Sequence, residues 1–242
     1  MKSGFVDVHH HLLHGLDDGP ASPDETVRML RQAARQGVVR LAATPHVRPG
    51  HAGFDMDLYR ERLGQARALA AAEGLEIEIV SGAEIMYTVS AVDWLRRDRV
   101  PLLGDGWYAL VEFYPDVSFS AICRAAMEIG NAGFGMVLAH AERYRALRWG
   151  DRLAQLKEDC GVKVQLNDGA VPACRGLLGD RWVRRILKEG LADVIASDAH
   201  NVDTRACVMR DCADVLSELC GRAAARRMLS CPAGVSVPDC QS

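Results

Sequence analysis

Residues 5–19, FVDVHHHLLHGLDDG, place four histidines and three aspartates within fifteen positions. Alternate residues of a β-strand point to the same face, so His9 and His11 are expected to face one way and His10 the other. Two imidazoles on one face are suited to binding a divalent metal ion. The segment alone would also fit a purification tag or a solvated polar run, so the interpretation depends on ligands elsewhere in the chain.

Further candidate ligands close other short apolar runs of the sequence. In the segment SDAH, Asp198 and His200 present a carboxylate and an imidazole two residues apart. The others are His46, Glu84, Glu112 and His140. Nitrogen and carboxylate ligands without a thiolate suit manganese, iron or zinc in a hydrolytic site with several ions, and Glu84 could bridge two of them. One acid or histidine at a strand end is usually structural, but eight in one pattern favour a shared metal site.

Short β-branched apolar runs alternate with amphipathic helical segments along the chain. The runs predict seven strands, at residues 5–9, 39–46, 77–84, 108–113, 135–142, 162–167 and 192–200. Helices are expected between them, among others at residues 23–37, with Ser22 as N-cap, 58–74 and 119–133. Seven strand–helix units predict an α/β fold whose parallel sheet closes, or nearly closes, into a barrel. An open doubly wound sheet is the alternative, although no glycine-rich dinucleotide fingerprint follows any of the strands. The candidate ligands would then meet at the rim formed by the carboxyl ends of the strands.

The bulk composition is that of an ordinary globular protein. The chain has 242 residues, 49% of them apolar and 25% charged, and no linker or repeat divides it, so one domain over residues 1–242 is expected. A net charge of −3 gives no basic field for nucleic acid or for an anionic membrane surface. Because neither a signal sequence nor an apolar run of membrane-spanning length is present, we expect a cytoplasmic protein without direct membrane insertion.

The remaining histidines and the cysteines carry weaker signals. His10, His14 and His51 fall outside the ligand pattern and are expected to be structural. All eight cysteines lie in the second half without a CxxC pair, and we expect them to be reduced and mostly buried. Cys220 and Arg226 have the C-x5-R spacing of cysteine-dependent tyrosine phosphatases. The alanine-rich segment between them predicts a helix instead of a phosphate-binding loop.

The motifs HHHLLHGLDDG, ATPH, GAE, LVEF, AHAERY, QLN and SDAHNVDTR follow one another in this order. Together they resemble the PHP-domain, manganese-dependent protein tyrosine phosphatases of bacteria, the type that regulates capsule and exopolysaccharide synthesis. The resemblance extends from residue 5 to about residue 230 and implies a distorted (β/α)7 barrel, in agreement with the seven expected strands. The family usually has HPERY where this chain has HAERY, a difference that removes no ligand.

The resemblance implies a centre of three divalent ions, manganese in the first place, with iron, zinc or magnesium as alternatives. The ligands implied for the first ion are His9, His11, Glu84 and Asp198. Those implied for the second are Glu84, Glu112 and His140, and those for the third are His46, His200 and Asp18. Arg143 and Arg205 match the arginines that hold phosphate in the family, so the implied site residues lie between positions 9 and 205.

The implied reaction is hydrolysis of phosphotyrosine. Three divalent ions and two guanidiniums would neutralise a phosphoryl group of about −1.5 to −2 charges, and a metal-bound water would supply the attacking hydroxide. A phenolate leaving group, with a parent pKa of about 10, needs little help from a general acid. The candidates for this acid are Asp18, if it is not fully engaged with metal, and a metal-bound water. The implied substrate is the autophosphorylated tail of a membrane-anchored tyrosine kinase. Two alternatives stay open: another PHP-type phosphoesterase, such as a histidinol-phosphate phosphatase or a nuclease, and a non-catalytic regulatory partner of the kinase.

Overall fold

The computed structural model describes residues 4–51, 53–176 and 178–230. Every pair of neighbouring strands is parallel, and the strands form two sheets with the orders β1-β2-β4 and β3-β5-β6-β7-β8-β9. The strands are β1 (Phe5–His10), β2 (Val38–Ala43), β3 (His46–Val47), β4 (Glu78–Val80), β5 (Glu84–Met86), β6 (Tyr108–Glu112), β7 (Gly135–Leu138), β8 (Lys163–Asn167) and β9 (Val194–Ala196). The predicted parallel α/β architecture is confirmed.

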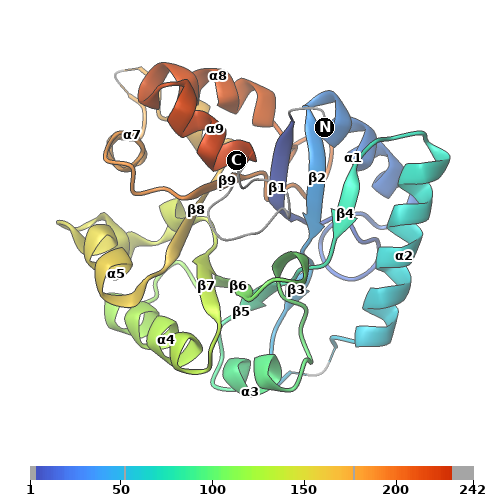
Figure 1. Ribbon diagram of the computed structural model, residues 1–242, viewed down its shortest axis with the longest axis horizontal. Helices are drawn as coiled ribbons and strands as arrows, with labels where there is room; N and C mark the ends of the chain where they lie inside the picture. Colours follow the sequence, from blue (N-terminus) through green and yellow to red (C-terminus); the bar gives the residue numbers. More distant parts are fainter. Residues whose placement is uncertain (1–3, 52, 177, 231–242) are drawn as a thin grey trace.

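Helices lie outside the curled sheet and surround it (Figure 1). They are α1 (Pro23–Arg35), α2 (Met56–Ala72), α3 (Ala91–Arg96), α4 (Phe119–Asn131), α5 (Arg152–Cys160), α6 (Ala170–Ala173), α7 (Arg181–Lys188), α8 (Met209–Cys220) and α9 (Arg222–Ser230). Ser22 caps α1 as predicted, since its side chain accepts from the N–H of Glu25. Among the helices that the structure describes, none combines the length and the hydrophobicity needed to cross a membrane.

The first and last strands lie side by side, so the sheet curls almost completely around. His10 of β1 forms an isolated parallel bridge with Ala199, which follows β9. Two hydrogen bonds flank this bridge: the N–H of His11 donates to the oxygen of Ala199 at 2.9 Å, and the N–H of Asp198 donates to the oxygen of His9 at 2.8 Å. The two ends of the sequence that carry the H-x-H and D-x-H pairs are therefore in direct contact.

Two of the predicted strands are interrupted, which corrects the expectation of single strands at 39–46 and 77–84. The first divides into β2 and β3 at residues 44–45, where Pro45 has no N–H to donate to a neighbouring strand. The second divides into β4 and β5 at residues 81–83. Gly82 lies there against Thr44, and a Cβ on Gly82 would stand 2.7 Å from the Thr44 methyl carbon. Both breaks occur at the same level of neighbouring strands, and His46 and Glu84 begin the short strands beyond them.

The strands predicted at 135–142 and 192–200 are also shorter than expected. His140 and Asp198 have φ values of 33° and 52°, in the left-handed region that a strand cannot accommodate. Non-glycine residues in this conformation are strained and occur preferentially at functional sites. The backbone therefore leaves the sheet just where these two predicted ligands lie.

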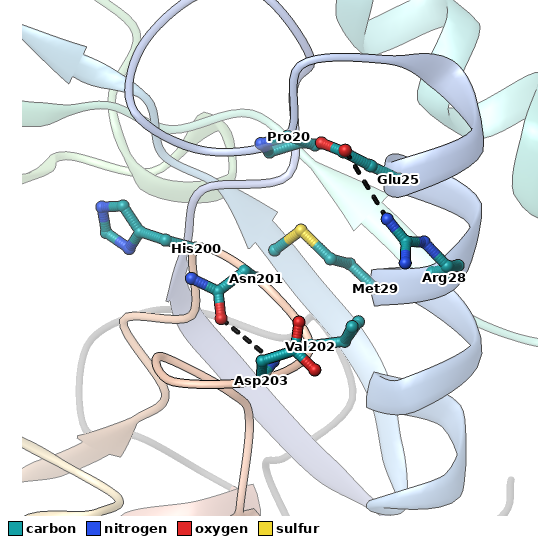
Figure 2. A pocket seen from close by; sticks show the side chains of 8 residues that line it. All are labelled: Pro20, Glu25, Arg28, Met29, His200, Asn201, Val202 and Asp203. Atoms are coloured by element: carbon teal, nitrogen blue, oxygen red, sulfur yellow. Dashed lines mark hydrogen bonds and ion pairs between the residues drawn. The ribbon is translucent and has the colours of Figure 1, made fainter.

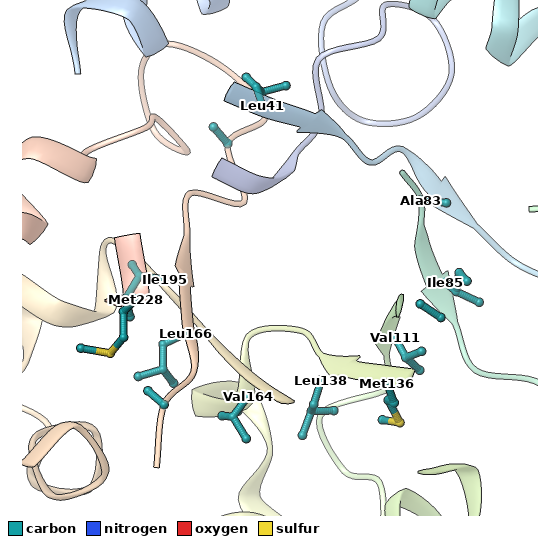
Figure 3. Close-up of a cluster of buried hydrophobic side chains, with 14 of the residues drawn as sticks. Leu41, Ala83, Ile85, Val111, Met136, Leu138, Val164, Leu166, Ile195 and Met228 are labelled. Carbon is teal, nitrogen blue, oxygen red and sulfur yellow. The ribbon is translucent and has the colours of Figure 1, made fainter. Parts of the chain in front are cut away.

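The core has two layers on opposite faces of the sheet. Inside the curl, small and medium side chains such as Val8, Leu110, Val137 and Ala196 pack together. Outside it, side chains of the alternate strand positions pack against the helices, as Figure 3 shows for several strands and for Met228 of α9. Strands with both faces buried read as continuous apolar runs, which is the pattern from which they were predicted.

The N-terminus of α7 gives a prediction about stability. The Asp180 side chain accepts from the N–H groups of Trp182 and Val183 and pairs with Arg148. We expect Asp180→Ala to lower the free energy of unfolding by about 1 kcal/mol through the lost cap, whereas Asp180→Asn should keep most of the cap. Thermal melts at pH 7 of both variants check this, and equal melting temperatures for Asp180→Ala and the unaltered protein would contradict it.

The effect of Asp180 should also depend on pH. Burial acts to raise the pKa of this carboxyl, but the hydrogen bond from Arg148, together with the backbone N–H donors, lowers it overall. A carboxyl with a lowered pKa stabilises the folded state above its unfolded pKa of about 4. This contribution is lost as the pH falls through the lower folded value. The difference in melting temperature between Asp180→Ala and the unaltered protein should therefore narrow in melts below pH 3.

Candidate metal centre

Three groups of potential ligands meet at the carboxyl ends of the strands. Within each group, one ligand atom per residue lies within 4.8 Å of every other. The groups are His9, His11, Glu84 and Asp198; His46, Glu84 and Glu112; and His11, Asp18, His46 and His200. Eight of the nine predicted ligands are therefore brought together in these groups, and His11, His46 and Glu84 each belong to two of them.

The first group surrounds the Nε2 atom of His9. This atom lies 3.1 Å from Nε2 of His11, 3.2 Å from Oε2 of Glu84 and 3.4 Å from Oδ1 of Asp198. Atoms bound to one ion at about 2.0–2.2 Å are themselves about 3.0–3.4 Å apart, so these spacings are those of a coordination shell. Both imidazoles offer the same nitrogen, which confirms that His9 and His11 share a face as the strand alternation predicts.

The second group shares Glu84 with the first. Nδ1 of His46 lies 3.0 Å from Oε2 of Glu84 and 3.0 Å from Oε1 of Glu112. The remaining predicted ligand, His140, also lies against these acids: its Nε2 is 2.6 Å from Oε1 of Glu84 and 3.8 Å from Oε2 of Glu112. The two oxygens of Glu84 thus face different histidines, as a bridging carboxylate requires.

The third group lies nearest to solvent. Oδ1 of Asp18 is 3.2 Å from Nε2 of His200 and 3.4 Å from Nε2 of His46. The ring of His11 stacks on that of His200 with centroids 3.6 Å apart. The Asp18 side chain is 59% exposed, whereas the side chain of His200 is buried. This end of the centre is therefore the one open to an incoming molecule.

Two polar atoms of the centre support a fit to metal ions. Oε2 of Glu84 and Nε2 of His200 are fully buried and make no hydrogen bond of regular geometry, although charged neighbours lie 3.0 Å and 3.2 Å away. Buried polar atoms without a partner are rare in native proteins, and an ion is one of the partners that satisfies them. Glu84, Glu112 and Asp198 also concentrate negative charge in a space from which water is largely excluded. A divalent cation supplies the charge that this donor set lacks.

The ionisation states of the side chains in the centre also support a fit to metal ions. Burial acts to raise the pKa of the Glu84 carboxyl, yet the surrounding imidazoles, His9 first, lower it well below its usual range. Burial acts to lower the pKa of His46, but hydrogen bonds to Glu112 and Glu84 raise it to about 10. The carboxylates thus hold protons on a histidine when no cation is bound. Metal binding at such a site displaces those protons.

Several side chains behind the ligands were not singled out by the sequence analysis. Gln165 accepts from Nδ1 of His9 at 3.0 Å, and the Tyr144 hydroxyl lies 3.3 Å from Nδ1 of His140. Asp17 lies 2.7 Å from Nδ1 of His11. Such partners fix the ring orientation of ligating histidines. The QLN, ERY and DDG motifs contained these residues, but nothing in the sequence showed which ligand each would contact.

Asn167, the last residue of β8, contacts one of the predicted ligands. Its side-chain N–H donates to Oδ2 of Asp198 at 2.9 Å. The amide therefore orients a predicted ligand.

The histidines predicted to be structural lie outside the three groups. His10 lies on the opposite side of β1, where its Nδ1 is 3.0 Å from the Ser197 hydroxyl and 3.3 Å from Oδ2 of Asp7. These contacts tie β1 to the end of β9. His14 is buried away from the centre, and His51 is exposed.

The cysteines do not form a phosphate-binding site in the described part of the chain. Cys220 is the last residue of α8, its thiol donates to the oxygen of Leu187, and a helix follows from Arg222. Burial raises the pKa of the Cys220 thiol, which opposes its use as a nucleophile. The predicted helical reading of this C-x5-R segment is confirmed. All six described cysteines are unpaired, and Cys231 and Cys240 lie outside the described residues.

The two predicted phosphate-binding arginines lie at the open end of the centre. Arg143 donates to Oδ2 of Asp198, and Arg205 donates to Oδ2 of Asp18 at 3.1 Å and to Oδ1 of Asp198 at 3.3 Å. Their side chains are 40% and 35% exposed. Both guanidiniums are thus near the predicted ligands and within reach of solvent.

An open hollow of about 370 Å³ adjoins the third group next to His200. Figure 2 shows α1 side chains, Met29 among them, along one wall and residues 201–203 along the other. Its charged groups are partly paired, since Arg28 lies 3.5 Å from Glu25. The surface beside the open end of the centre is therefore mixed, with apolar and charged parts.

A curled parallel sheet that gathers histidines and carboxylates at the carboxyl ends of its strands is typical of metal-dependent hydrolases with a barrel-like α/β fold. Comparison with known proteins narrows this class to one family. The chain belongs to the family described as capsular polysaccharide synthesis, CpsB/CapC, whose model matches residues 5–235. The predicted resemblance is thereby confirmed.

Named relatives of this chain are tyrosine phosphatases. It is 31% identical over 230 residues to the tyrosine-protein phosphatase CpsB of Streptococcus pneumoniae, covering 93% of this chain and 94% of that protein. It is 29% identical to the tyrosine-protein phosphatase YwqE of Bacillus subtilis, covering 83% of this chain and 79% of that protein.

Solved structures support the same relationship. A crystal structure from work on YwqE and CpsB, described there as unique metal-dependent tyrosine phosphatases, superposes with a TM-score of 0.83 at 28% identity. It covers 91% of this chain and 89% of that one. An amidohydrolase from Mycoplasma synoviae superposes with a TM-score of 0.59 at 10% identity, over 94% of this chain and 86% of the amidohydrolase chain. At this identity the similarity shows the fold alone.

Proposed function

We propose that this protein is a metal-dependent protein-tyrosine phosphatase. The observation that carries the proposal is the set of three ligand groups, two of which contain Glu84, in a chain whose relatives are named tyrosine-protein phosphatases. The fold similarity to structures described as metal-dependent tyrosine phosphatases supports it further. Burial raises the pKa of each of the six described cysteine thiols, which opposes their use as nucleophiles.

We propose three divalent ions, manganese in the first place, with the predicted ligands. His9, His11, Glu84 and Asp198 hold the first, in agreement with the first group of the structure. Glu84, Glu112 and His140 hold the second; the contacts of His140 with both acids support this, although His46 also faces them. The third is held by Asp18, His46 and His200, with His11 beside them.

The chain's own residues then divide the work of phosphate hydrolysis. When bound, divalent ions at such a site polarise a phosphoryl oxygen and make water acidic enough to act as a nucleophile at neutral pH. Arg143 and Arg205 hold the outer phosphoryl oxygens, because a planar guanidinium matches the oxygens of a phosphate in pairs and stabilises charge that builds during the reaction. Once Asp198 and Asp18 hold cations, both arginines are free to turn from these carboxylates to the phosphate.

The proposed leaving group is the phenolate of tyrosine. Asp18, the most exposed acid of the centre, is the proposed proton donor if it is not fully engaged with metal, and a metal-bound water is the alternative donor. The open end beside Asp18 and His200, with the adjoining hollow, supports a substrate larger than a phosphate ion. We propose that this substrate is the autophosphorylated tail of a membrane-anchored tyrosine kinase, with the protein itself in the cytoplasm, and that the family's connection to capsular polysaccharide synthesis reflects this reaction.

The fold supports a single-domain reading of this activity. We propose that residues 1–242 act as one domain with the topology of a distorted (β/α)7 barrel. Counting β2 with β3 and β4 with β5 as interrupted strands gives seven positions around the sheet. The contact between β1 and the segment after β9 supports closure.

A phosphopeptide panel tests the proposed function. We expect manganese-loaded protein to hydrolyse p-nitrophenyl phosphate and phosphotyrosine peptides, and to act much more slowly on matched phosphoserine peptides, because an alkoxide is a poorer leaving group than a phenolate. Phosphate release measured with each peptide checks this. Equal rates on both would contradict the tyrosine preference, and no turnover of any substrate by fully loaded protein would favour a non-catalytic partner.

A further inference from the structure

The DDG motif contains two acids, of which only Asp18 belongs to a ligand group. We propose that Asp17 is a positioning residue of the metal centre, which fixes the orientation of His11 as a ligand and holds its loop against the start of β3. The inference rests on the proposed metal centre. Asp17 acts by positioning other residues and contacts neither the ions nor the substrate.

Asp17 contacts the nitrogen of His11 that faces away from the centre. Nε2 of His11 lies 3.2 Å from Oε2 of Glu84, whereas its Nδ1 lies 2.7 Å from Oδ2 of Asp17. A carboxylate on the far nitrogen of an imidazole keeps the proton on that side, orients the ring and strengthens the other nitrogen as a ligand. His11 and His46 are the two imidazoles that belong to two groups each, and Asp17 contacts the ring of the first and the backbone N–H of the second.

Three other predicted ligand histidines have weaker partners on the corresponding nitrogen. His9 faces the amide oxygen of Gln165, His140 faces the hydroxyl of Tyr144, and His200 faces a backbone oxygen at 2.9 Å, with Oδ1 of Asp198 farther away at 3.6 Å. Among these four histidines, within the part of the chain that the structure describes, His11 alone has a carboxylate at hydrogen-bond distance from this nitrogen. Asp17 therefore differs from the partners of the other three rings in carrying a negative charge.

The remaining contacts of Asp17 join two segments that carry ligands. The same Oδ2 accepts from the backbone N–H of His46 at 3.0 Å, and Oδ1 accepts from the N–H of Gly19 at 2.9 Å. Both oxygens are therefore used, and the side chain is only 5% exposed. Through these bonds one carboxylate sets the position of His11, of the His46 backbone and of the loop that presents Asp18.

Gly19 shows how closely this loop is packed. A Cβ at position 19 would lie 2.7 Å from the backbone oxygen of His11 and 2.9 Å from Oδ1 of Asp17. Only glycine allows the chain to turn back onto β1 at this distance. The loop is thus built around the Asp17 carboxylate, which is the arrangement expected of a support for ligands.

The proposal is tested by the metal affinity of Asp17→Asn and Asp17→Ala. An asparagine has a single acceptor oxygen and cannot replace both, and loss of such outer partners costs about 10–100-fold in metal affinity. We expect manganese titrations by calorimetry to show a dissociation constant about 10-fold weaker for at least one ion in Asp17→Asn and about 100-fold weaker in Asp17→Ala. Asp24→Asn, which removes an equal charge from an exposed position close by in sequence, should leave the dissociation constants unchanged.

Thermal melts in chelator separate positioning from folding. We expect metal-free Asp17→Asn to melt within a few degrees of metal-free unaltered protein, while the gain in melting temperature on adding manganese is smaller. Unchanged affinity for every ion in Asp17→Asn would overturn the proposal, as would a collapse of the metal-free fold in both variants. Because metal binding is measured without substrate, these outcomes are distinct from a failure of the proposed phosphatase activity, which would show in the unaltered protein.

Discussion

Glu84→Gln is expected to reduce phosphotyrosine hydrolysis by more than about 100-fold. Loss of a residue behind the ligands already costs about 10–100-fold in metal affinity or activity, and Glu84 lies in the centre itself. It belongs to two of the three ligand groups, and its oxygens face different histidines. Glutamine keeps the shape of the side chain but removes the charge and leaves one oxygen in place of two, so a single substitution should weaken two ions together.

The measurement is the rate on p-nitrophenyl phosphate at saturating manganese, together with the metal content of the purified variant. Glu158→Gln, on the exposed surface of α5, makes the same chemical change away from the centre and should behave like the unaltered protein. Full metal content and full activity in Glu84→Gln would rule out Glu84 as a bridging ligand.

Chelation is expected to abolish activity, and thiol alkylation is expected to spare it. Burial raises the pKa of all six described cysteines, so little thiolate is present at neutral pH to react. The proposed chemistry has no cysteine nucleophile. Treatment with EDTA should therefore remove the hydrolysis of p-nitrophenyl phosphate, and added manganese should restore it.

Cys220→Ser gives the matched genetic control for this comparison. Its thiol lies at the end of α8 and donates to a backbone oxygen, so serine is expected to leave turnover within about twofold of the unaltered protein. A cysteine-dependent phosphatase would show the opposite results. Loss of activity in Cys220→Ser with metal content unchanged, or full activity in excess EDTA, would contradict the metal-dependent mechanism.

Local rules were sufficient to predict the strands and most of the ligands. Alternation along a strand separated His9 and His11 from His10, and the structure confirms this separation. It holds despite a bulge in β1, where the three residues from Asp7 to His10 span the same length as two residues of β2. The ligands were recognised because each closes an apolar run, a signal that is present in the chain itself. Parallel strands bring their carboxyl ends to the same rim whatever their separation in sequence.

Backbone breaks and outer contacts could not be predicted in the same way. The left-handed backbone conformations of His140 and Asp198 depend on tertiary packing. Neither histidine nor aspartate prefers this conformation to the extended one by itself, so the residue type does not predict it. Gln165 contacts His9, which is distant in sequence, and Asp17 contacts His11 from an irregular loop. The partners of both residues are therefore known only once the chain is folded. The sequence indicated which side chains come together at the rim but not which contacts hold them in place.

The adjacency of β1 and β9 has a consequence for the synthesis of the protein. The first ligand group needs His9 at one end and Asp198 at the other, so no N-terminal fragment shorter than 198 residues contains it. During translation, the histidines and acids of the earlier strands lack Asp198 as a partner until the segment after β9 has left the ribosome. An ion bound by this group would therefore be bound only late in synthesis, and a prematurely terminated product would lack the complete group even where its helices had formed.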